Sequence, residues 1–203
     1  MEPSDLREYV KGLPTYSEEL GLDLTRASDR FKWFVASILF SSRISSSIAK
    51  STYQKLEENG FTSPEGLIMA GWNRIVTALD SGGYTRYDFS TATYLLEDAK
   101  KLQDEYGSLD ELHRQSSDPR DLERRLKEFK GMGPVGVNIF LRELRGIWDK
   151  AQPKPQKNAV EIAEKIGLDD VEKYESQLVR LFIEHCKKHD CERCPLERYC
   201  KKE

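Results

Sequence analysis

All four cysteines of this 203-residue chain lie within its last 18 residues, and this placement constrains the fold more than any other feature. The four are Cys186, Cys191, Cys194 and Cys200, separated in turn by four, two and five residues. Thiols this close together, in a chain with no secretory features, are typical of a metal site rather than of disulfides. We therefore expect a short loop that wraps a metal at the end of the helix carrying Cys186.

Two kinds of metal site use four cysteine thiolates, a structural zinc ion and a [4Fe–4S] cluster. Structural zinc sites usually pair two Cys-x2-Cys knuckles, whereas this tail contains one, formed by Cys191 and Cys194. A single compact loop that holds all four ligands favours the cluster, with zinc as the alternative. Cys186 also continues the apolar stripe of its helix, so the inorganic core would face the protein interior.

Apolar residues recur at helical spacing along nearly the whole chain. The stripe of Phe31, Phe34 and Ile38 is one example. Glycine and proline separate the helical segments, as with Pro64 at a first helical position and Gly107 at a helix end. No segment shows the alternation of a half-buried strand. We predict an all-α protein of about ten short helices.

Composition excludes some classes of protein. No apolar run approaches the roughly 20 residues that a membrane-spanning helix needs, and the first residues, MEPSDLREYVKG, lack an apolar signal segment. We expect a cytoplasmic protein. The formal net charge of −3, from 32 basic and 35 acidic residues, taken alone argues against a nucleic-acid partner. Basic residues nevertheless gather in residues 120–130, 142–157 and 187–193, so the total averages over unequal surfaces.

A glycine pair joins two helical segments within residues 126–144, LKEFKGMGPVGVNIFLREL. Gly131 and Gly133 permit a tight turn and let the backbone approach another molecule closely. The N–H groups at the start of the second helix have no helical partner, so they form an anion site suited to a DNA phosphate. Lys130 lies next to this turn. A plain helix–helix connection is the alternative interpretation.

Together, the hairpin and the cysteine tail resemble the endonuclease III branch of the helix-hairpin-helix DNA glycosylases. The segments FVASILFSSRISSSIAK and GGYTRYDFSTATYLL extend the resemblance over nearly the whole chain. It implies a six-helix barrel over residues 29–145 and an iron–sulfur domain made of residues 1–28 and 146–203, with DNA bound in the cleft between these lobes. It also implies base excision repair: a damaged or mispaired base is flipped out of duplex DNA and its glycosidic bond is cleaved. We expect a monomer that carries a [4Fe–4S] cluster and acts with chromosomal DNA in the cytoplasm.

The resemblance assigns roles to individual residues. Gly131 and Gly133 would grip a phosphate through their backbone. Arg43 would fill the gap left by the flipped base, and Tyr84 would abut the opposite strand; the alternatives are a surface arginine and a packing residue. Further phosphate contacts would come from Lys130, Lys154 and Lys157. The ligands of the cluster would be the four cysteines.

The residues that carry the family's chemistry are absent. The family aspartate that supports positive charge on the sugar falls at Gln156 when counted back from Gly167, or at Asn158 when matched to the helix cap. The family lysine that attacks the sugar falls at Val135.

Three explanations remain open from the sequence. The first is a lesion-binding module that has lost excision. The second is a replacement of the missing groups, with Lys157 as an amine activated by burial and Asp149 or Glu161 as the carboxylate. The third is a different register of the loop, which leaves Asp149 as the nearest upstream acid. The sequence leaves open whether the protein is an enzyme and which lesion it recognises.

Overall fold

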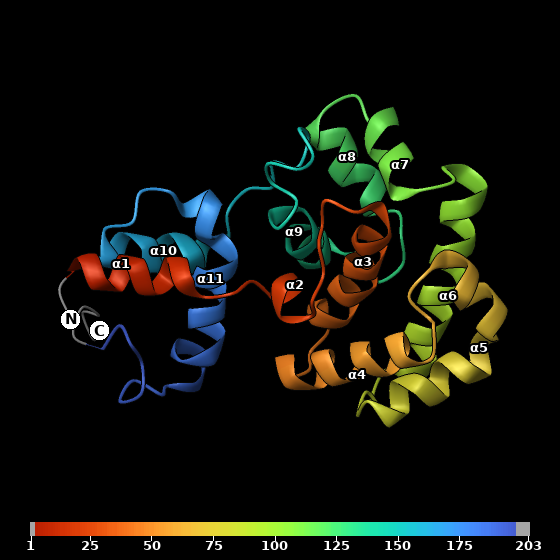
Figure 1. The fold of residues 1–203 in the computed structure, drawn as a ribbon, viewed down its shortest axis with the longest axis horizontal. Helices are drawn as coiled ribbons and strands as arrows, with labels where there is room; N and C mark the ends of the chain where they lie inside the picture. The colour runs from red at the N-terminus through yellow and green to blue at the C-terminus, as the bar shows by residue number, and fades with distance from the viewer. Residues whose placement is uncertain (1–2, 198–203) are drawn as a thin grey trace. The chain divides into compact units, whose positions relative to one another are not determined.

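The protein is helical throughout the part that the computed structural model describes, which is the backbone of residues 3–197 and the side chains of residues 6–197. The helices are α1 (Pro3–Gly12), α2 (Tyr16–Glu19), α3 (Ala27–Ser41), α4 (Ser46–Glu58), α5 (Pro64–Ser81), α6 (Asp88–Glu105), α7 (Leu109–Gln115), α8 (Pro119–Leu126), α9 (Pro134–Arg142), α10 (Lys157–Ile166), α11 (Val171–Glu184) and the 3-10 helix η1 (Cys186–Lys188) (Figure 1). No strand occurs among these residues, which confirms the all-α prediction. None of the described helices is both long and apolar enough to cross a membrane.

Local sequence explains where several helices begin. Ser63 caps α5 by accepting a hydrogen bond from the N–H of Gly66, and Asp118 caps α8 in the same way through the N–H of Asp121. Pro64 occupies the first helical position after its cap. A capping oxygen satisfies one of the N–H groups that a helix start leaves without a partner. These short polar residues therefore fix the helix starts that flank the apolar stripes.

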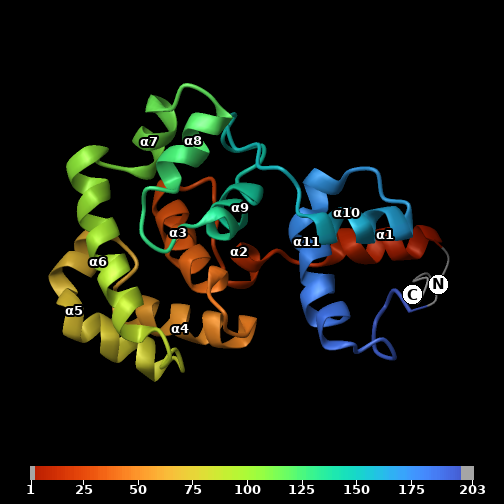
Figure 2. The same ribbon diagram turned by 180° about the vertical axis from the view of Figure 1, so that it is seen from behind.

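The larger of two compact units comprises residues 20–153. Within it α3 packs against α4, α7 and α9, and α5 packs along α6 (Figures 1 and 2). The ring of Phe34 makes edge-on contacts with Phe129 at 5.4 Å and Phe140 at 5.7 Å between centroids. The indole N–H of Trp33 donates to the carbonyl of Phe140 at 3.2 Å. This buried aromatic cluster holds α9 and the turn before it against α3.

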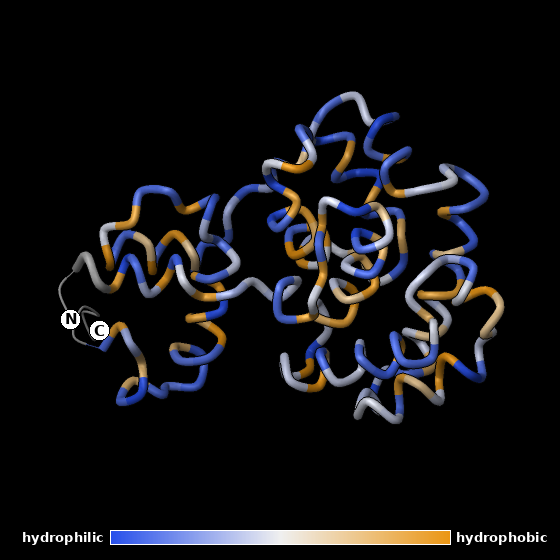
Figure 3. Tube along the Cα trace, viewed as in Figure 1, coloured by the Kyte–Doolittle hydropathy of each residue, from blue (hydrophilic) through white to orange (hydrophobic). Residues whose placement is uncertain are grey.

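The smaller unit is built from residues 1–19 and 154–203. Here α1, α10 and α11 enclose one hydrophobic core, and the hydropathy colouring of Figure 3 shows apolar residues alternating with polar ones along each of these helices. The core includes Leu6, Val10, Ala159, Ile162, Ala163, Leu178 and Leu181. Arg180 joins the two stretches of chain, because its guanidinium contacts both Glu19, at 2.6 Å, and Glu184, at 2.9 Å.

The division between the units lies at residues 19/20 and 153/154, whereas the resemblance implies boundaries at 28/29 and 145/146. The intervening segments belong with residues 20–153 because they pack there. The carbonyl of Leu24 accepts a hydrogen bond from Arg30 at 2.7 Å. The ring of Trp148 contacts Phe140, and its N–H donates to Asp110 at 3.1 Å.

Asp98 on α6 ties that helix to the turn that follows α8. Its buried Oδ1 accepts a hydrogen bond from the backbone N–H of Lys130 at 2.7 Å, and no described residue bonds to Oδ2. Burial raises the pKa of Asp98 to about 7, the hydrogen bond from Lys130 opposes this shift, and the negative charge of Glu97 adds to it. The carboxyl group therefore changes charge near neutral pH.

We expect this carboxyl group to make the protein less stable as the pH rises. Between pH 5 and 7 the folded state retains a proton on Asp98 that the unfolded chain, with its carboxyl pKa near 3.8, has already lost. The free energy of unfolding should therefore fall by about 2–3 kcal/mol between pH 5 and pH 8 on account of this group. Urea unfolding across this pH range should show that Asp98→Asn lacks this part of the pH dependence of the free energy of unfolding. An unchanged slope in the variant would contradict the assignment.

Candidate functional site

The turn between α8 and α9 requires a glycine at position 131. Gly131 has a φ of +78°, in the left-handed region that side chains disfavour. A Cβ at this position would lie 3.0 Å from Cγ2 of Ile38 on α3. The carbonyl of Gly131 accepts a hydrogen bond from the hydroxyl of Ser41 at 3.3 Å. Gly131 thus lets the turn lie directly on α3.

Gly133 differs, because the fold itself does not need a glycine there. It is the N-cap of α9, with a φ of −68°, and a Cβ would meet no atom within 4 Å. Gly133 is exposed together with Pro134 and Val135. Within the described part of the chain, the N–H groups of Gly133, Val135 and Gly136 have no hydrogen-bond acceptor. The start of α9 therefore offers the N–H groups of the exposed Gly133 and Val135 to an anion, and a Cβ at Gly133 would meet open space, whereas Gly136 is buried.

The basic side chains around the hairpin are largely neutralised by acidic partners. The ammonium group of Lys130 lies 2.5 Å from a carboxylate oxygen of Glu97, and that of Lys127 lies 3.1 Å from Glu123. Within α8, two arginines pair with acids one turn away: Arg124 with Asp121 and Glu128, and Arg125 with Asp121. The basic run at residues 120–130 therefore carries less net positive charge than its sequence indicates.

Arg43 is exposed and Tyr84 is buried, although Tyr84 contacts the loop that carries Arg43. Arg43 is exposed in the loop between α3 and α4. Tyr84 is only 1% exposed, and its hydroxyl group forms hydrogen bonds with the hydroxyls of Ser42 and Thr91. Tyr84 therefore cannot touch a DNA strand in this conformation. It acts on the loop instead, because it holds Ser42 next to the exposed Arg43.

Gln156, where the spacing back from Gly167 places the counterpart of the family aspartate, occupies the N-cap position of α10. Its side chain makes no capping hydrogen bond. Asn158 lies inside the first turn, where its Oδ1 accepts from the neighbouring N–H of Ala159 at 2.9 Å, so the prediction of a cap at Asn158 was wrong. The pairing of Asn158 with Glu161 resembles a capping box, but the helix begins at Lys157, one residue before Asn158.

A carboxylate that the sequence did not reveal lies at this same helix start. Oε1 of Glu175, from α11, accepts a hydrogen bond from the backbone N–H of Gln156 at 3.0 Å. The side chain of Glu175 is 1% exposed. No local signal marks it, because it is one of several polar residues in the stretch YESQ.

The weaker catalytic candidates are on the surface. Lys157 is 91% exposed and forms an ion pair with Glu161 at 3.4 Å, so the burial expected to activate its amine is absent. Lys154 is also exposed. Val135, at the position of the family lysine, is 55% exposed at the start of α9.

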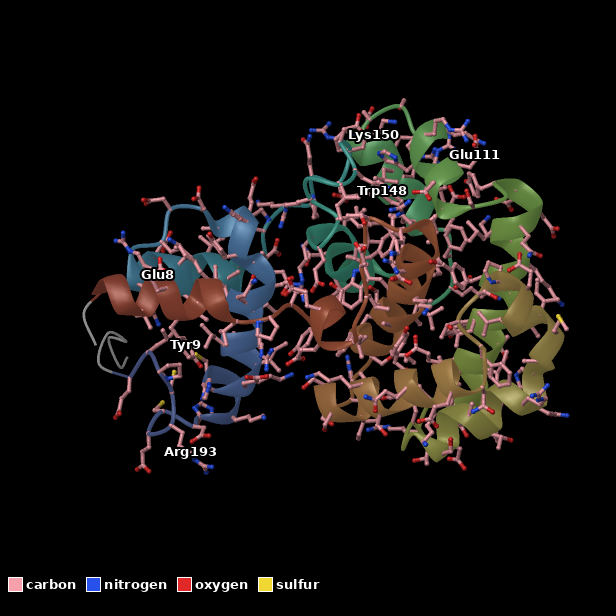
Figure 4. The ribbon with its side chains drawn as sticks, viewed as in Figure 1. Glu8, Tyr9, Glu111, Trp148, Lys150 and Arg193 are labelled. Carbon is pink, nitrogen blue, oxygen red and sulfur yellow. The ribbon has the colours of Figure 1, made fainter. Side chains whose placement is uncertain are left out.

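Asp149 belongs to a contact that holds the segment after α9 against α7. Its Oδ1 lies 2.8 Å from Nε2 of His113, and the His113 ring stacks on Trp148 with 4.6 Å between centroids. Lys150 donates to the carbonyl of His113 at 3.0 Å; Figure 4 shows Trp148 and Lys150 beside the helix that carries Glu111. Burial lowers the pKa of His113, and the hydrogen bond with Asp149 opposes this shift. These contacts give Asp149 a structural role.

The cysteine loop begins at the end of α11. Cys186 and Cys194 are partly buried and pack against the hydrophobic core of the smaller unit, while Cys191 is exposed. The N–H of Cys194 donates to the carbonyl of Cys191 at 3.1 Å, so these two residues share a tight turn. Cys200 lies outside the described residues.

The donor set of this loop fits an iron–sulfur cluster in its chemistry, because it consists of thiols on one short segment. Among the described residues, no three His, Cys, Asp or Glu side chains lie close enough together to hold a metal ion. Arg193, on the same loop, is exposed and pairs with Asp190 at 3.4 Å (Figure 4). The described part of the loop thus places two sulfurs at the core edge and leaves the third in solvent.

No family model and no curated protein matches this chain. The candidate site therefore rests on the hairpin, the start of α10 and the cysteine loop of this chain alone.

Two substitutions should distinguish Gly131, which the fold of the hairpin requires, from Gly133, which it does not require. Gly131→Ala should lower the free energy of unfolding by about 2 kcal/mol, because it forces a side chain into the left-handed region against Ile38. Gly133→Ala should change it by less than about 1 kcal/mol, since the added Cβ meets open space. Urea unfolding of both variants tests this, and equal losses would contradict the distinction.

Proposed function

We propose that this protein binds duplex DNA in base excision repair, engages an extruded base or an abasic site, and carries a [4Fe–4S] cluster. The observation that carries the proposal is the start of α9. Gly133 is exposed, and the fold does not require a glycine at this position. It lies beside N–H groups that have no acceptor in the described part of the chain. A glycine without a side chain at an exposed helix start permits close approach of a phosphate.

Most of the hairpin's side-chain charge is already paired, so the backbone N–H groups would make the principal phosphate contact. Arg43 is exposed and forms no hydrogen bond or ion pair with the described residues, which suits the side chain that would enter the duplex in place of a flipped base. Lys154 and Lys157, both exposed on either side of Gln156, would add phosphate contacts.

The cluster would be held by Cys186, Cys191, Cys194 and Cys200. When bound, it supplies four iron–thiolate bonds that cross-link the segment after α11. Because Cys186 and Cys194 pack on the core of the smaller unit, those bonds would fix the loop to α11 and α1. We propose a structural role for the group.

A lesion-binding module without excision is the second candidate. The observation that favours it is the N-cap of α10, where Gln156 supplies a neutral amide, and the exposed Val135, which supplies no amine. A lyase acting through Lys157 has less support, because that side chain is exposed and paired with Glu161.

A panel of duplexes tests the proposal. Each duplex carries an oxidised pyrimidine, a uracil, a mismatch or an abasic site, and an intact duplex is the reference. We expect at least one lesion duplex to bind about tenfold more tightly than the intact one. Gly133→Ala should weaken binding to all duplexes, because its Cβ obstructs the phosphate. Equal affinity for lesion and intact DNA would refute the proposal.

The same panel distinguishes the candidate activities. Release of a base identifies a glycosylase, and tight binding without release identifies the lesion-binding module. Borohydride trapping of a covalent adduct on abasic DNA, lost in Lys157→Ala, would identify the lyase.

The metal is tested on protein purified without oxygen. We expect about four iron atoms per chain and a broad absorption near 400 nm. Cys194→Ala should lose the iron and destabilise the smaller unit, whereas Lys188→Ala, on the same loop, should retain it. Zinc in place of iron, or iron that survives Cys194→Ala, would overturn the cluster assignment.

A further inference from the structure

An exposed apolar patch lies on α5 and α6, two helices of the larger unit that pack side by side (Figures 1 and 2). The rings of Trp72 on α5 and Phe89 on α6 are in contact, with 5.4 Å between their centroids. Phe89 is 61% exposed, and Met69, three residues before Trp72, is 84% exposed. Single exposed hydrophobic residues are normal on a protein, whereas a group of them marks an interaction surface. We call Met69, Trp72 and Phe89 the α5/α6 patch.

Hydrogen bonds and a glycine fix the two rings of the α5/α6 patch in place. The indole N–H of Trp72 donates to the hydroxyl group of Thr93 on α6 at 3.0 Å, and this hydroxyl group donates to the carbonyl of Phe89 at 2.9 Å. Gly71 interrupts α5 directly before Trp72, with a φ of +70° in the left-handed region that favours glycine. Rings that are held before binding lose little conformational entropy when a partner covers them. The patch is therefore preorganised for contact.

The α5/α6 patch and the hairpin lie on opposite sides of α6. The carboxylate of Asp98 faces the turn after α8, because it accepts the N–H of Lys130 at 2.7 Å. Asp98 follows Phe89 by nine residues, or about two and a half helical turns, so the two side chains leave opposite sides of the helix. A partner on the patch would thus leave Gly133 and the start of α9 uncovered.

At one end of the α5/α6 patch, an acid on α5 lies next to a base on α6. Oε1 of Glu65 accepts a hydrogen bond from the amide of Gln103 at 2.6 Å, which places Glu65 against α6. Lys100 is exposed one turn before Gln103, on the side of α6 that carries Phe89, and it forms no ion pair with the described residues. Because the amide is neutral, the charges of Glu65 and Lys100 are both available to a partner.

The opposite end of the α5/α6 patch repeats this arrangement. Asp80 is exposed near the end of α5, about two helical turns after Trp72. Arg86 is exposed three residues before Phe89, and its guanidinium group lies over the ring of Tyr87, 5.3 Å from the centroid. Acidic residues therefore border the patch on the α5 side, and basic residues border it on the α6 side.

This distribution of charge is complementary to itself. The two helices run antiparallel, since the start of α5 contacts the end of α6. A two-fold rotation about an axis parallel to them places α5 of one copy over α6 of the other at the same level. Glu65 then faces Lys100 of the partner subunit, Asp80 faces Arg86 of the partner subunit, and each pair occurs twice. Asp104, one turn beyond Lys100, faces the N-terminus of the other copy's α5, where a negative charge is favourable.

We propose that the protein forms a two-fold symmetric homodimer in which the α5/α6 patches of the two copies cover each other. Both copies contribute apolar residues to the centre of the interface and opposite charges to its rim, as is typical of protein interfaces. A DNA strand suits this face less, because its acidic residues repel phosphates. The dimer departs from the monomer that the resemblance implies. It does not depend on the proposed function, and it leaves the hairpins of both copies uncovered.

Sedimentation velocity of the full-length protein, purified without oxygen, tests this inference. We expect a monomer–dimer equilibrium with a dissociation constant on the order of 10 μM, because the interface is small. Phe89→Ser should raise this constant about tenfold, since an aromatic ring leaves the interface on both copies. The matched control is Ile147→Ser, which removes an exposed hydrophobic residue of the same unit outside the patch and should leave the constant unchanged.

Charge reversal tests the two-fold arrangement. Lys100→Glu should weaken the dimer about tenfold, because each copy then opposes like charges at Glu65 of the partner subunit. Adding Glu65→Lys to the same chain exchanges the two charges and should restore the dimer. A double variant that stays as weak as Lys100→Glu alone would refute the arrangement.

Two results would overturn the dimer itself. One is a wild-type protein that stays monomeric up to about 200 μM, and this measurement decides even where a variant fails to fold. The other is a dimer that Phe89→Ser leaves as tight as before. If the wild-type protein is a monomer and Phe89→Ser lowers its affinity for duplex DNA, the patch contacts DNA instead and the inference fails.

Discussion

The hairpin depends on two hydrogen bonds between its turn and other helices. Asp98 of α6 accepts the N–H of Lys130, and Ser41 of α3 donates to the carbonyl of Gly131. The missing side chain at Gly131 lets Ile38 pack against the turn at short range. A turn anchored on one side presents its other side in a fixed orientation. Gly133 and the N–H groups that follow are therefore preorganised, so little ordering entropy is lost when an anion binds.

Ion pairs in α8 and the residues directly after it explain why a basic run in a sequence is a weak guide to phosphate binding. The positive charges of Arg124 and Lys127 face acids one helical turn away. Such pairs contribute little stability, but they cancel charge locally. Affinity for a nucleic acid would then depend on backbone donors and a few separate side chains, with a weaker dependence on salt than a lysine-rich surface has.

Much of the fold could be predicted from the sequence because its signals are local. Apolar spacing and glycine breaks located the helices, whereas the cap of α10, expected at Asn158, lies two residues earlier at Gln156. The contacts of Asp98 and Glu175 could not be predicted in this way, because their partners lie 32 and 19 residues away. Both residues resemble ordinary surface acids until the helices pack. The burial of Tyr84 was equally hidden, since exposed and buried tyrosines look alike in a sequence.

The two units differ in the order in which their segments are synthesised. Residues 20–153 form one continuous stretch, so this unit can fold as soon as that stretch has emerged. The smaller unit needs α1 to meet α10 and α11, which are synthesised much later, and α1 must wait with its apolar face uncovered. The four cysteines all follow α11 in the sequence. A chain interrupted before α11 would thus possess a complete hairpin but neither a core for α1 nor any of these four thiols.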